Sequence, residues 1–173
     1  MNVTIPYSPR KQQAFIHTEL DKKRFSVLCC HRRFGKTVML INHLIKCCMT
    51  NKNHAPRFAY IAPTYSQAKK IAWDYLKFYT KNIPNTKYNE TELRADFFNG
   101  SRIQLLSAEN PDSIRGIYLD GVVCDEASQI NRELVDEVLR PALSDRKGWM
   151  TLCSTPKGMN NIFYELYLKA QSD

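Results

Sequence analysis

The sequence lacks the features that mark membrane, secreted and repetitive proteins. No apolar run approaches the roughly 20 residues that a membrane-spanning helix needs, and the opening MNVTIPYSPRKQQ has no apolar centre of a signal peptide. The 6 cysteines form no CxxC pair and are too few and irregular for a disulfide scaffold. Repeats, low-complexity tracts and Gly/Ser linkers are missing. These absences predict a soluble intracellular protein with reduced thiols, folded as a single domain over residues 1–173.

Positive charge is present in excess, and it is unevenly placed. The chain has 25 Lys+Arg against 17 Asp+Glu, a formal charge of +8, and the whole excess lies in residues 1–60. Such a local excess indicates an anionic partner, either nucleotide phosphate or nucleic acid. A solubilising surface would give the same composition, so charge alone leaves both interpretations open.

Strand-like and helix-like segments alternate along the chain. Buried strands are predicted over residues 25–30, 57–62, 118–124 and 149–153, and helices over 37–49, 66–79, 132–139 and 161–169. In the second helix Ile71, Tyr75 and Phe78 follow the 3.6-residue period, and the third is expected to end near Pro141. This rhythm predicts an α/β fold with a mainly parallel sheet and helices on both faces.

An antiparallel hairpin is expected within this parallel arrangement. Two alternating runs, 93–98 and 101–106, flank Asn99-Gly100. Both residues tolerate the positive φ of a type I′ turn, which makes this dipeptide a strong hairpin signal. The sequence therefore predicts a hairpin inserted into the sheet.

The first candidate site is Cys30-His-Arg-Arg-Phe-Gly-Lys-Thr37, between a predicted strand and a predicted helix. It matches GxxxxGK[ST] at Gly35, Lys36 and Thr37, with Cys30 where the pattern has glycine. In that pattern backbone N–H groups cradle phosphates, the lysine reaches the terminal phosphates and the hydroxyl binds Mg²⁺. The alternative is an accidental tripeptide at a helix start, but the strand before and the helix after favour a phosphate-binding loop.

The second candidate site is Gly121-Val-Val-Cys-Asp-Glu126, an apolar run that ends in two carboxylates. Nucleotide hydrolysis needs one acid to hold the Mg²⁺ shell and another to polarise water, and Asp125 and Glu126 supply both. Alone, the pair could equally favour the start of the next helix. Together with the phosphate loop upstream, the catalytic interpretation is preferred.

Three further features complete the candidate site. Ser154-Thr155-Pro156 follows a predicted strand, where its hydroxyls would sense a terminal phosphate, although it equally fits a simple turn. Arg32 and Arg33 lie within the loop, and Arg115 precedes Gly116 in a turn-rich stretch. A cation near the transferred phosphoryl group stabilises its developing charge, so each arginine is a candidate for this role.

At these residues the sequence resembles the ATPase domain of the large terminase of tailed phages, the motor that drives DNA into a procapsid. The similar segments occur in the family's order and span most of the chain; they are Tyr7–Gln13, Cys30–Thr37, Tyr60–Tyr65, Ser113–Gly116, Val122–Ala127 and Ser154–Pro156.

The resemblance implies a three-layer P-loop NTPase of the ASCE or RecA-like type that uses ATP and Mg²⁺. It implies that Lys36 and Thr37 bind phosphate and metal with Arg33, Phe34 and Gly35, that Asp125 supports the metal and that Glu126 activates water. It further implies that Arg32 acts in cis, that Arg115 reaches a neighbouring subunit, and that Ser154, Thr155 and Pro156 couple hydrolysis to movement. An adenine-contacting segment would comprise Tyr7, Arg10 and either Gln12 or Gln13.

The same resemblance implies double-stranded DNA, a portal and a small terminase subunit as partners, ring assembly in the full motor, and action in the cytoplasm of the infected host. The isolated domain is expected to be monomeric. Family members carry a nuclease domain after the ATPase domain, so none is expected in residues 1–173, no DNA cleavage is expected, and Ile162, Phe163 and Leu166 are expected to lack a packing partner.

Two other functions fit parts of the sequence. A helicase-like nucleic-acid translocase shares the phosphate loop and the carboxylate pair, but the tandem second motor domain is missing here. A non-catalytic nucleic-acid-binding module with a decayed nucleotide site is suggested by Cys30 alone. The intact Lys36, Thr37, Asp125 and Glu126 count against that module.

Overall fold

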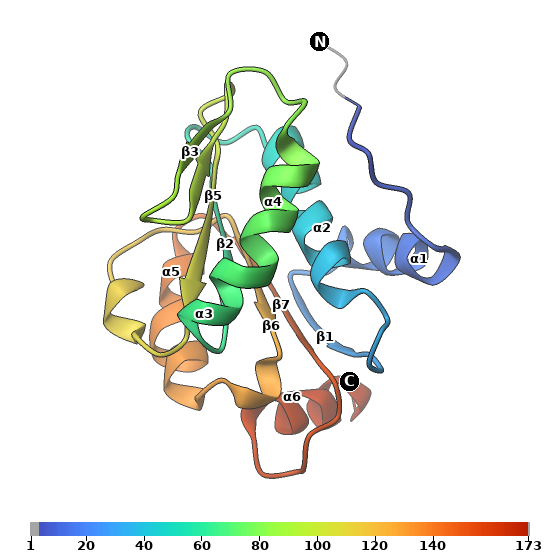
Figure 1. Ribbon diagram of the computed structural model, residues 1–173. Coiled ribbons are helices and arrows are strands. Elements are labelled where there is room, and N and C mark those ends of the chain that lie inside the picture. Colours follow the sequence, from blue (N-terminus) through green and yellow to red (C-terminus); the bar gives the residue numbers. More distant parts are fainter. Residues whose placement is uncertain (1–3, 173) are drawn as a thin grey trace.

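The computed structural model describes residues 4–172, and these form a single sheet with helices on both faces (Figure 1). Its strands are β1 (Phe25–Cys29), β2 (Arg57–Ala62), β3 (Lys87–Asn89), β4 (Arg94–Asp96), β5 (Arg102–Ser107), β6 (Gly121–Asp125) and β7 (Trp149–Ser154). They lie in the order β1-β7-β6-β2-β5-β4-β3. The first five of that order are parallel, and β4 and β3 extend one edge antiparallel. The predicted α/β fold class is confirmed.

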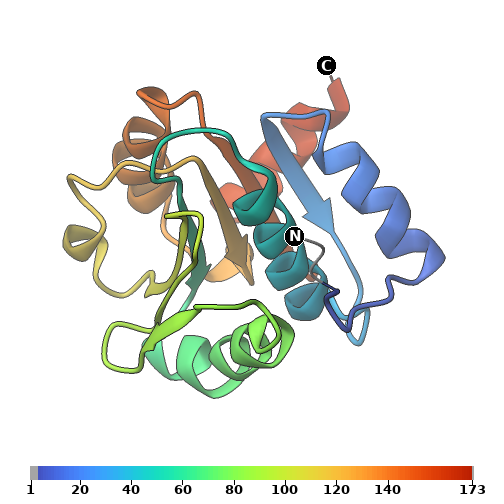
Figure 2. The same cartoon turned by 90° about the horizontal axis from the view of Figure 1, so that it is seen from above.

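The helices divide between the two faces of this sheet (Figure 2). They are α1 (Lys11–Leu20), α2 (Lys36–Thr50), α3 (Tyr65–Gln67), α4 (Trp73–Thr80), α5 (Arg140–Ser144) and α6 (Ile162–Ser172), with π-helical turns at Ala68–Ala72 and Leu134–Leu139. Helices α2 and α4 cover one face, whereas α5 and α6 cover the other. Among the described residues, no helix is both long and apolar enough to cross a bilayer.

Alternation along the strands builds two cores. Side chains of successive strand residues point to opposite faces, so Phe58 and Tyr60 of β2 pack against α2 and α4, and Ile61 packs on the α5 side. Leu44 in α2 is completely buried. Burying such a side chain stabilises the fold by about 1.5–3 kcal/mol. The sheet is thereby a rigid support for the loops at its ends.

The helical segment 65–80 does not bury the face predicted from its sequence. Ile71, Tyr75 and Phe78 remain 50%, 38% and 48% exposed, whereas Trp73 and Leu76 are buried. The π-helical turn Ala68–Ala72 inserts an extra residue between α3 and α4, which rotates the face that follows it. Burial of the larger indole therefore determines the orientation of α4.

The helix expected to end near Pro141 continues through it to Ser144. Proline in a helix clashes with the carbonyl four residues earlier and donates no hydrogen bond. The wider π-helical turn Leu134–Leu139 directly precedes α5 and relieves that conflict, so Pro141 lies near the start of a regular turn.

The hairpin between β4 and β5 is present, but its turn is not type I′. Gly100 has a φ of 79°, and Asn99 has no positive φ. The Gly100 N–H donates to the Phe97 carbonyl and the Phe97 N–H to the Ser101 carbonyl. This pattern is a three-residue loop in which only the last position needs the left-handed region, so glycine alone satisfies it.

Helix α6 has a packing partner within the chain, contrary to expectation. Ile162 and Phe163 are each 4% exposed in the core shared by α5 and β7, and Leu166 packs against the same core. Helix α1 and strand β3 are additional elements that sequence patterns did not predict. Helix α1 has only a weak apolar stripe, and β3 has three residues, so neither has a clear period.

Candidate nucleotide-binding site

Three neighbouring strands end side by side at one edge of the sheet. In the parallel register Cys29 of β1 pairs with Ser154 of β7, and Cys153 pairs with Asp125 of β6. Ligands of parallel α/β sheets bind beyond the carboxyl ends of the strands. The phosphate-loop, hydroxyl and carboxylate motifs, far apart in sequence, are thus brought together at this edge.

The loop between β1 and α2 is held in a conformation that requires glycine. Gly35 has a φ of 82°, and a Cβ there would lie 3.0 Å from Arg10 Nη2 and 3.0 Å from Gln13 Nε2. Arg33 also has a positive φ, 63°. Helix α2 begins directly after Gly35, so the N–H groups of its first turn and its positive dipole end face the site.

Helix α1 fixes this loop from outside. Arg10 Nη2 and Gln13 Nε2 both donate to the Phe34 carbonyl, the latter at 3.1 Å. Gln13 Oε1 accepts from the Arg10 backbone N–H at 3.0 Å. Gln13 is 4% exposed, whereas Gln12 is on the solvent side. Of the two glutamines, Gln13 therefore supports the loop.

Cys30 is compatible with the loop despite replacing the usual glycine. It is 8% exposed and packs in the core beneath the loop. A hydrogen bond from Cys153 lowers the pKa of the Cys30 thiol, burial opposes this and Lys36 assists it. Because the side chain lies in the core, the loop above it keeps its shape.

Asp125 is the most constrained carboxylate of the site. Its Oδ2 accepts hydrogen bonds from Thr37 Oγ1 at 2.6 Å and from the Tyr60 hydroxyl at 2.6 Å, and its Oδ1 accepts from the Glu126 N–H at 3.0 Å. Burial, followed by the charge of Asp125, raises the pKa of Tyr60 well above its usual value. Tyr60 therefore stays a neutral donor that orients this carboxylate.

Glu126 lies beside Asp125 in a strained backbone conformation, with φ 49° and ψ 44°. One carboxylate oxygen is 3.5 Å from Lys36 Nζ, and the other accepts from Ser154 Oγ at 3.5 Å and Thr155 Oγ1 at 3.4 Å. Left-handed geometry in a non-glycine residue is uncommon and is found at functional sites. Here it directs Glu126 toward both the loop and the end of β7.

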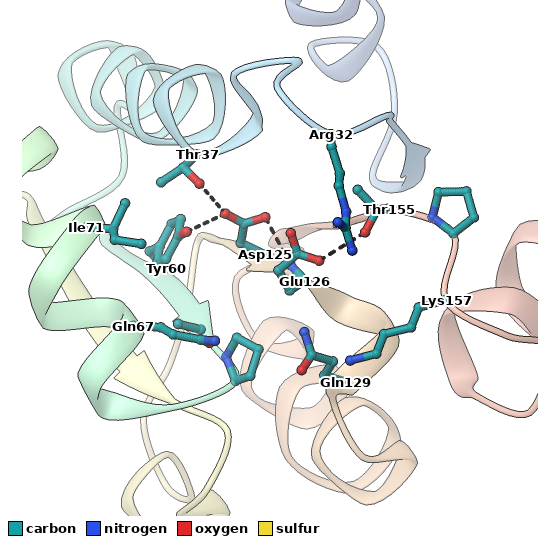
Figure 3. Close-up of a pocket in the computed structure, with 13 residues that line it drawn as sticks. Arg32, Thr37, Tyr60, Gln67, Ile71, Asp125, Glu126, Gln129, Thr155 and Lys157 are labelled. Carbon is teal, nitrogen blue, oxygen red and sulfur yellow. Dashed lines mark hydrogen bonds between the residues drawn. The ribbon is translucent and has the colours of Figure 1, made fainter.

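A cavity of about 410 Å³ opens between these groups (Figure 3). Arg32 extends into it from the loop, and Asp125 and Glu126 form its base. Pro156 lies on its wall. Four polar side chains on the wall were not predicted as site residues; these are Tyr60, Gln67, Gln129 and Lys157. Tyr60 lies within β2 and begins the similar segment Tyr60–Tyr65, but no role was assigned to it. The other three belong to no recognised motif, and only their positions after β2, β6 and β7 would have indicated them.

Some predicted site residues lie away from this cavity. Arg115 is on a different surface, where Asp112 at 2.9 Å and Glu133 at 3.1 Å hold its guanidinium. Tyr7 lies against α1 and α4, hydrogen-bonded to His17 and edge-on to Tyr79. Arg33 is exposed beside the cavity wall rather than in it. In one chain, then, these three do not reach the carboxylates.

The glycine-lysine-threonine loop follows β1, the acid pair lies at the end of β6, and β7 lies between these two strands. This arrangement defines a P-loop NTPase of the ASCE type. Within that class the chain belongs to the terminase large subunit family. The family model described as "Terminase large subunit, T4likevirus-type, N-terminal" matches residues 31–172.

Known proteins of this family match nearly the whole chain. A terminase large subunit of Thermus phage G20c is 30% identical over 181 residues, which cover 94% of this chain and 36% of the relative. The large terminase ATPase domain of Thermus phage P74-26 has a TM-score of 0.77 at 29% identity, covering 95% of this chain and 71% of that one. The chain spans little more than a third of the length of its curated relatives.

The fold also matches a large terminase of a thermophilic bacteriophage that was solved in complex with ATP-gamma-S. This match has a TM-score of 0.75 at 18% identity and covers 94% of this chain and 42% of that chain. At this identity the likeness concerns the fold alone.

Proposed function

We propose that this chain is an ATP-hydrolysing motor domain that couples Mg-ATP hydrolysis to the movement of double-stranded DNA into a procapsid. One observation carries the proposal: Thr37, Asp125 and Glu126 line a single cavity in a member of the terminase family, and Lys36 is paired with Glu126. The ATP-gamma-S complex of a protein with this fold supports ATP as the ligand.

The residues present fit a divalent cation bound with the nucleotide. Thr37 Oγ1 and Asp125 Oδ2 lie 2.6 Å apart. Both are hard oxygen ligands, the type that Mg²⁺ prefers. Thr37 would bind the cation, and Asp125 would hold its water shell. When bound, Mg²⁺ neutralises charge on the phosphates. The buried Tyr60 hydroxyl keeps the carboxylate oriented for this task.

Lys36 and Glu126 have complementary tasks. In the structure the Lys36 ammonium is paired with Glu126 at 3.5 Å. Phosphate oxygens at the loop would compete for this ammonium, which leaves the Glu126 carboxylate able to accept a proton from water. General base catalysis of this kind contributes about 10²–10⁴-fold to a rate.

The remaining residues are assigned by where they lie. Arg32, extended into the cavity, would stabilise charge on the phosphoryl group in cis, and Arg115, away from its own cavity, would act on a neighbouring copy. Ser154 and Thr155 contact Glu126, so they would transmit hydrolysis to the end of β7, with Pro156 following. Gln13 and Arg10 would support the loop beside the adenine, with Tyr7 and Gln12 further out.

The partners of the motor follow from the family and not from residues of this chain. We propose duplex DNA, a portal, a small terminase subunit and further copies of the chain as partners, acting in the cytoplasm of the infected host. DNA held through its phosphates would bind less tightly as salt rises.

The test is steady-state phosphate release from ATP and Mg²⁺ over rising protein concentration, with Lys36→Ala and Arg115→Ala as variants. Lys36→Ala should abolish nucleotide binding and turnover. Arg115→Ala should leave nucleotide binding intact and remove the part of the activity that rises more than linearly with concentration. Lys23→Ala is the matched control, because Lys23 is exposed and precedes β1, at the end of the strand opposite to the phosphate loop. Failure of the parent to bind ATP would contradict the proposal and favour a decayed nucleotide site.

A further inference from the structure

Apolar side chains are exposed along the helical segment that begins at the nucleotide cavity. Ile71, Tyr75 and Phe78 are 50%, 38% and 48% exposed. Tyr75 stacks on Tyr79 with ring centroids 6.4 Å apart, and Phe78 meets Tyr79 edge-on at 5.0 Å. We call these four residues the α4 stripe. Large apolar and aromatic side chains exposed together on one helical segment indicate a site of interaction with another molecule.

The α4 stripe is flanked by uncompensated positive charge. Lys69, Lys70 and Lys81 are exposed, and none forms an ion pair with another residue of the range 4–172. The Lys81 ammonium lies 4.5 Å from the centroid of the Phe78 ring. Lys77, by contrast, is paired with Asp74 and Glu90. A surface that buries this stripe must therefore bring acidic groups.

The same chain carries a surface with the complementary properties. A groove of about 430 Å³ combines apolar side chains with two carboxylates and one guanidinium, and it is lined by Ile117, Val138, Pro141, Glu137, Asp145 and Arg115. We call this the acidic groove. Within the described part of the chain Glu137 and Asp145 have no cationic partner, whereas Arg115 is held by Asp112 and Glu133.

The two surfaces lie on opposite faces of the sheet. The α4 stripe belongs to the helices that cover the α2 side, and the acidic groove is formed by α5, the turn before it and the loop before β6 on the other side (Figure 2). One chain therefore cannot join them to each other. Two copies placed head to tail can, and the contact repeats from copy to copy until a ring closes.

We propose that the acidic groove of one copy receives the α4 stripe of the next copy. Ile71 lies both on the stripe and on the wall of the nucleotide cavity. Arg115 lines the groove, so the contact brings its guanidinium to the helix that borders the neighbour's cavity. The inference rests on the proposed function in treating that cavity as the nucleotide site and in taking further copies of the chain as partners. It assigns the two surfaces through which one copy meets the next, and it departs from the expectation that the isolated domain is monomeric.

Charge reversal tests this pairing without any need for turnover. One variant carries Lys70→Glu with Lys81→Glu, and a second carries Glu137→Lys with Asp145→Lys. Like charges then face each other in each variant alone, which should lower the association constant about tenfold or more in sedimentation velocity at low salt. Lys23→Glu with Lys169→Glu makes the same charge change at exposed residues that belong to neither surface and should associate like the parent.

Mixing the two variants is the decisive step. In an equimolar mixture each contact between the two different variants again joins opposite charges, so association should be clearly stronger than that of either variant alone. Phe78→Ala, which changes no charge at an exposed position, should also weaken association. A parent that stays monomeric at all concentrations with and without nucleotide, or a mixture that associates no more strongly than either variant alone, would overturn the proposal.

Binding of a duplex oligonucleotide tests the alternative explanation, in which the α4 stripe binds nucleic acid. If Lys70→Glu with Lys81→Glu weakens DNA binding while self-association is unchanged, the α4 stripe is a nucleic-acid surface and the proposal is wrong. A parent protein that self-associates but neither binds nor hydrolyses ATP would instead count against the proposed function alone. The two failures are therefore distinguishable.

Discussion

The stability of the protein should fall as the pH drops from 6.5 toward 4, and His43 is the main reason. His43 is 2% exposed, with its ring stacked on His17 and edge-on to Trp149. Burial, and then the charge of His17, lowers its pKa from 6.5 to about 4, with smaller effects of Asp21 and Lys46. Its Nδ1 lies 3.0 Å from His17 Nδ1, so at least one of the two rings must be neutral there.

The sign follows from proton binding. Above pH 6.5 the ring is neutral in both states, and the full stability is present. Between about pH 6.5 and 4 the unfolded chain binds a proton that the native protein excludes. The free energy of unfolding therefore decreases as the pH is lowered through this range. At 1.36 kcal/mol per pKa unit, the difference between 6.5 and about 4 amounts to about 3 kcal/mol. The pKa of His17 is also lowered, which adds to the loss.

Urea denaturation at a series of pH values between 7.5 and 4 measures this directly. The parent should lose about 1 kcal/mol per pH unit through His43 once the pH is below 6.5. His43→Gln should remove most of that slope, whereas His54→Gln, at an exposed position, should retain it. A His43→Gln variant with the parental slope would refute the reasoning.

Three further substitutions have expected outcomes. Gly35→Ala forces a Cβ to 3.0 Å from Arg10 and Gln13 at a φ of 82°, so it should lower the free energy of unfolding by about 1–3 kcal/mol and weaken ATP binding, measured by urea denaturation and titration calorimetry. Leu44→Ala empties a completely buried position in α2 and should cost about 2–5 kcal/mol in the same denaturation assay, whereas an unchanged midpoint would contradict the packing described. Tyr60→Phe removes a buried donor to Asp125, and it should cost about 1 kcal/mol of stability and raise the Mg²⁺ concentration needed for half-maximal turnover.

The local patterns of the sequence predicted the central strands and the motifs at their ends. Residues 57–62 form β2 as predicted, because a continuous apolar run bounded by Pro63 is specific for a buried strand. Gly35, Lys36, Asp125 and Glu126 were predicted as site residues because each motif follows or ends such a strand. That the loop and the carboxylates meet at one end of the sheet required the strand order, which local patterns do not contain.

The errors share a physical cause, which is tertiary packing overriding local preference. The face of α4 was predicted wrongly because a π-helical turn, invisible to a 3.6-residue period, rotates it toward Trp73. Pro141 did not end its helix because a second π-helical turn relieves the clash. Gln67 and Lys157 were missed as cavity residues because only the fold brings their loops to the carboxylates.

The most direct test of the central claim separates ATP binding from ATP hydrolysis in the Glu126→Gln variant. The amide keeps the shape of the side chain but cannot accept a proton from water. The account predicts ATP affinity at least equal to that of the parent, since Lys36 loses a competing carboxylate, with turnover reduced by about 10²–10⁴-fold. Glu92→Gln, at an exposed residue of the sheet extension, should behave like the parent in both assays. Turnover by Glu126→Gln near the parental rate would contradict the account.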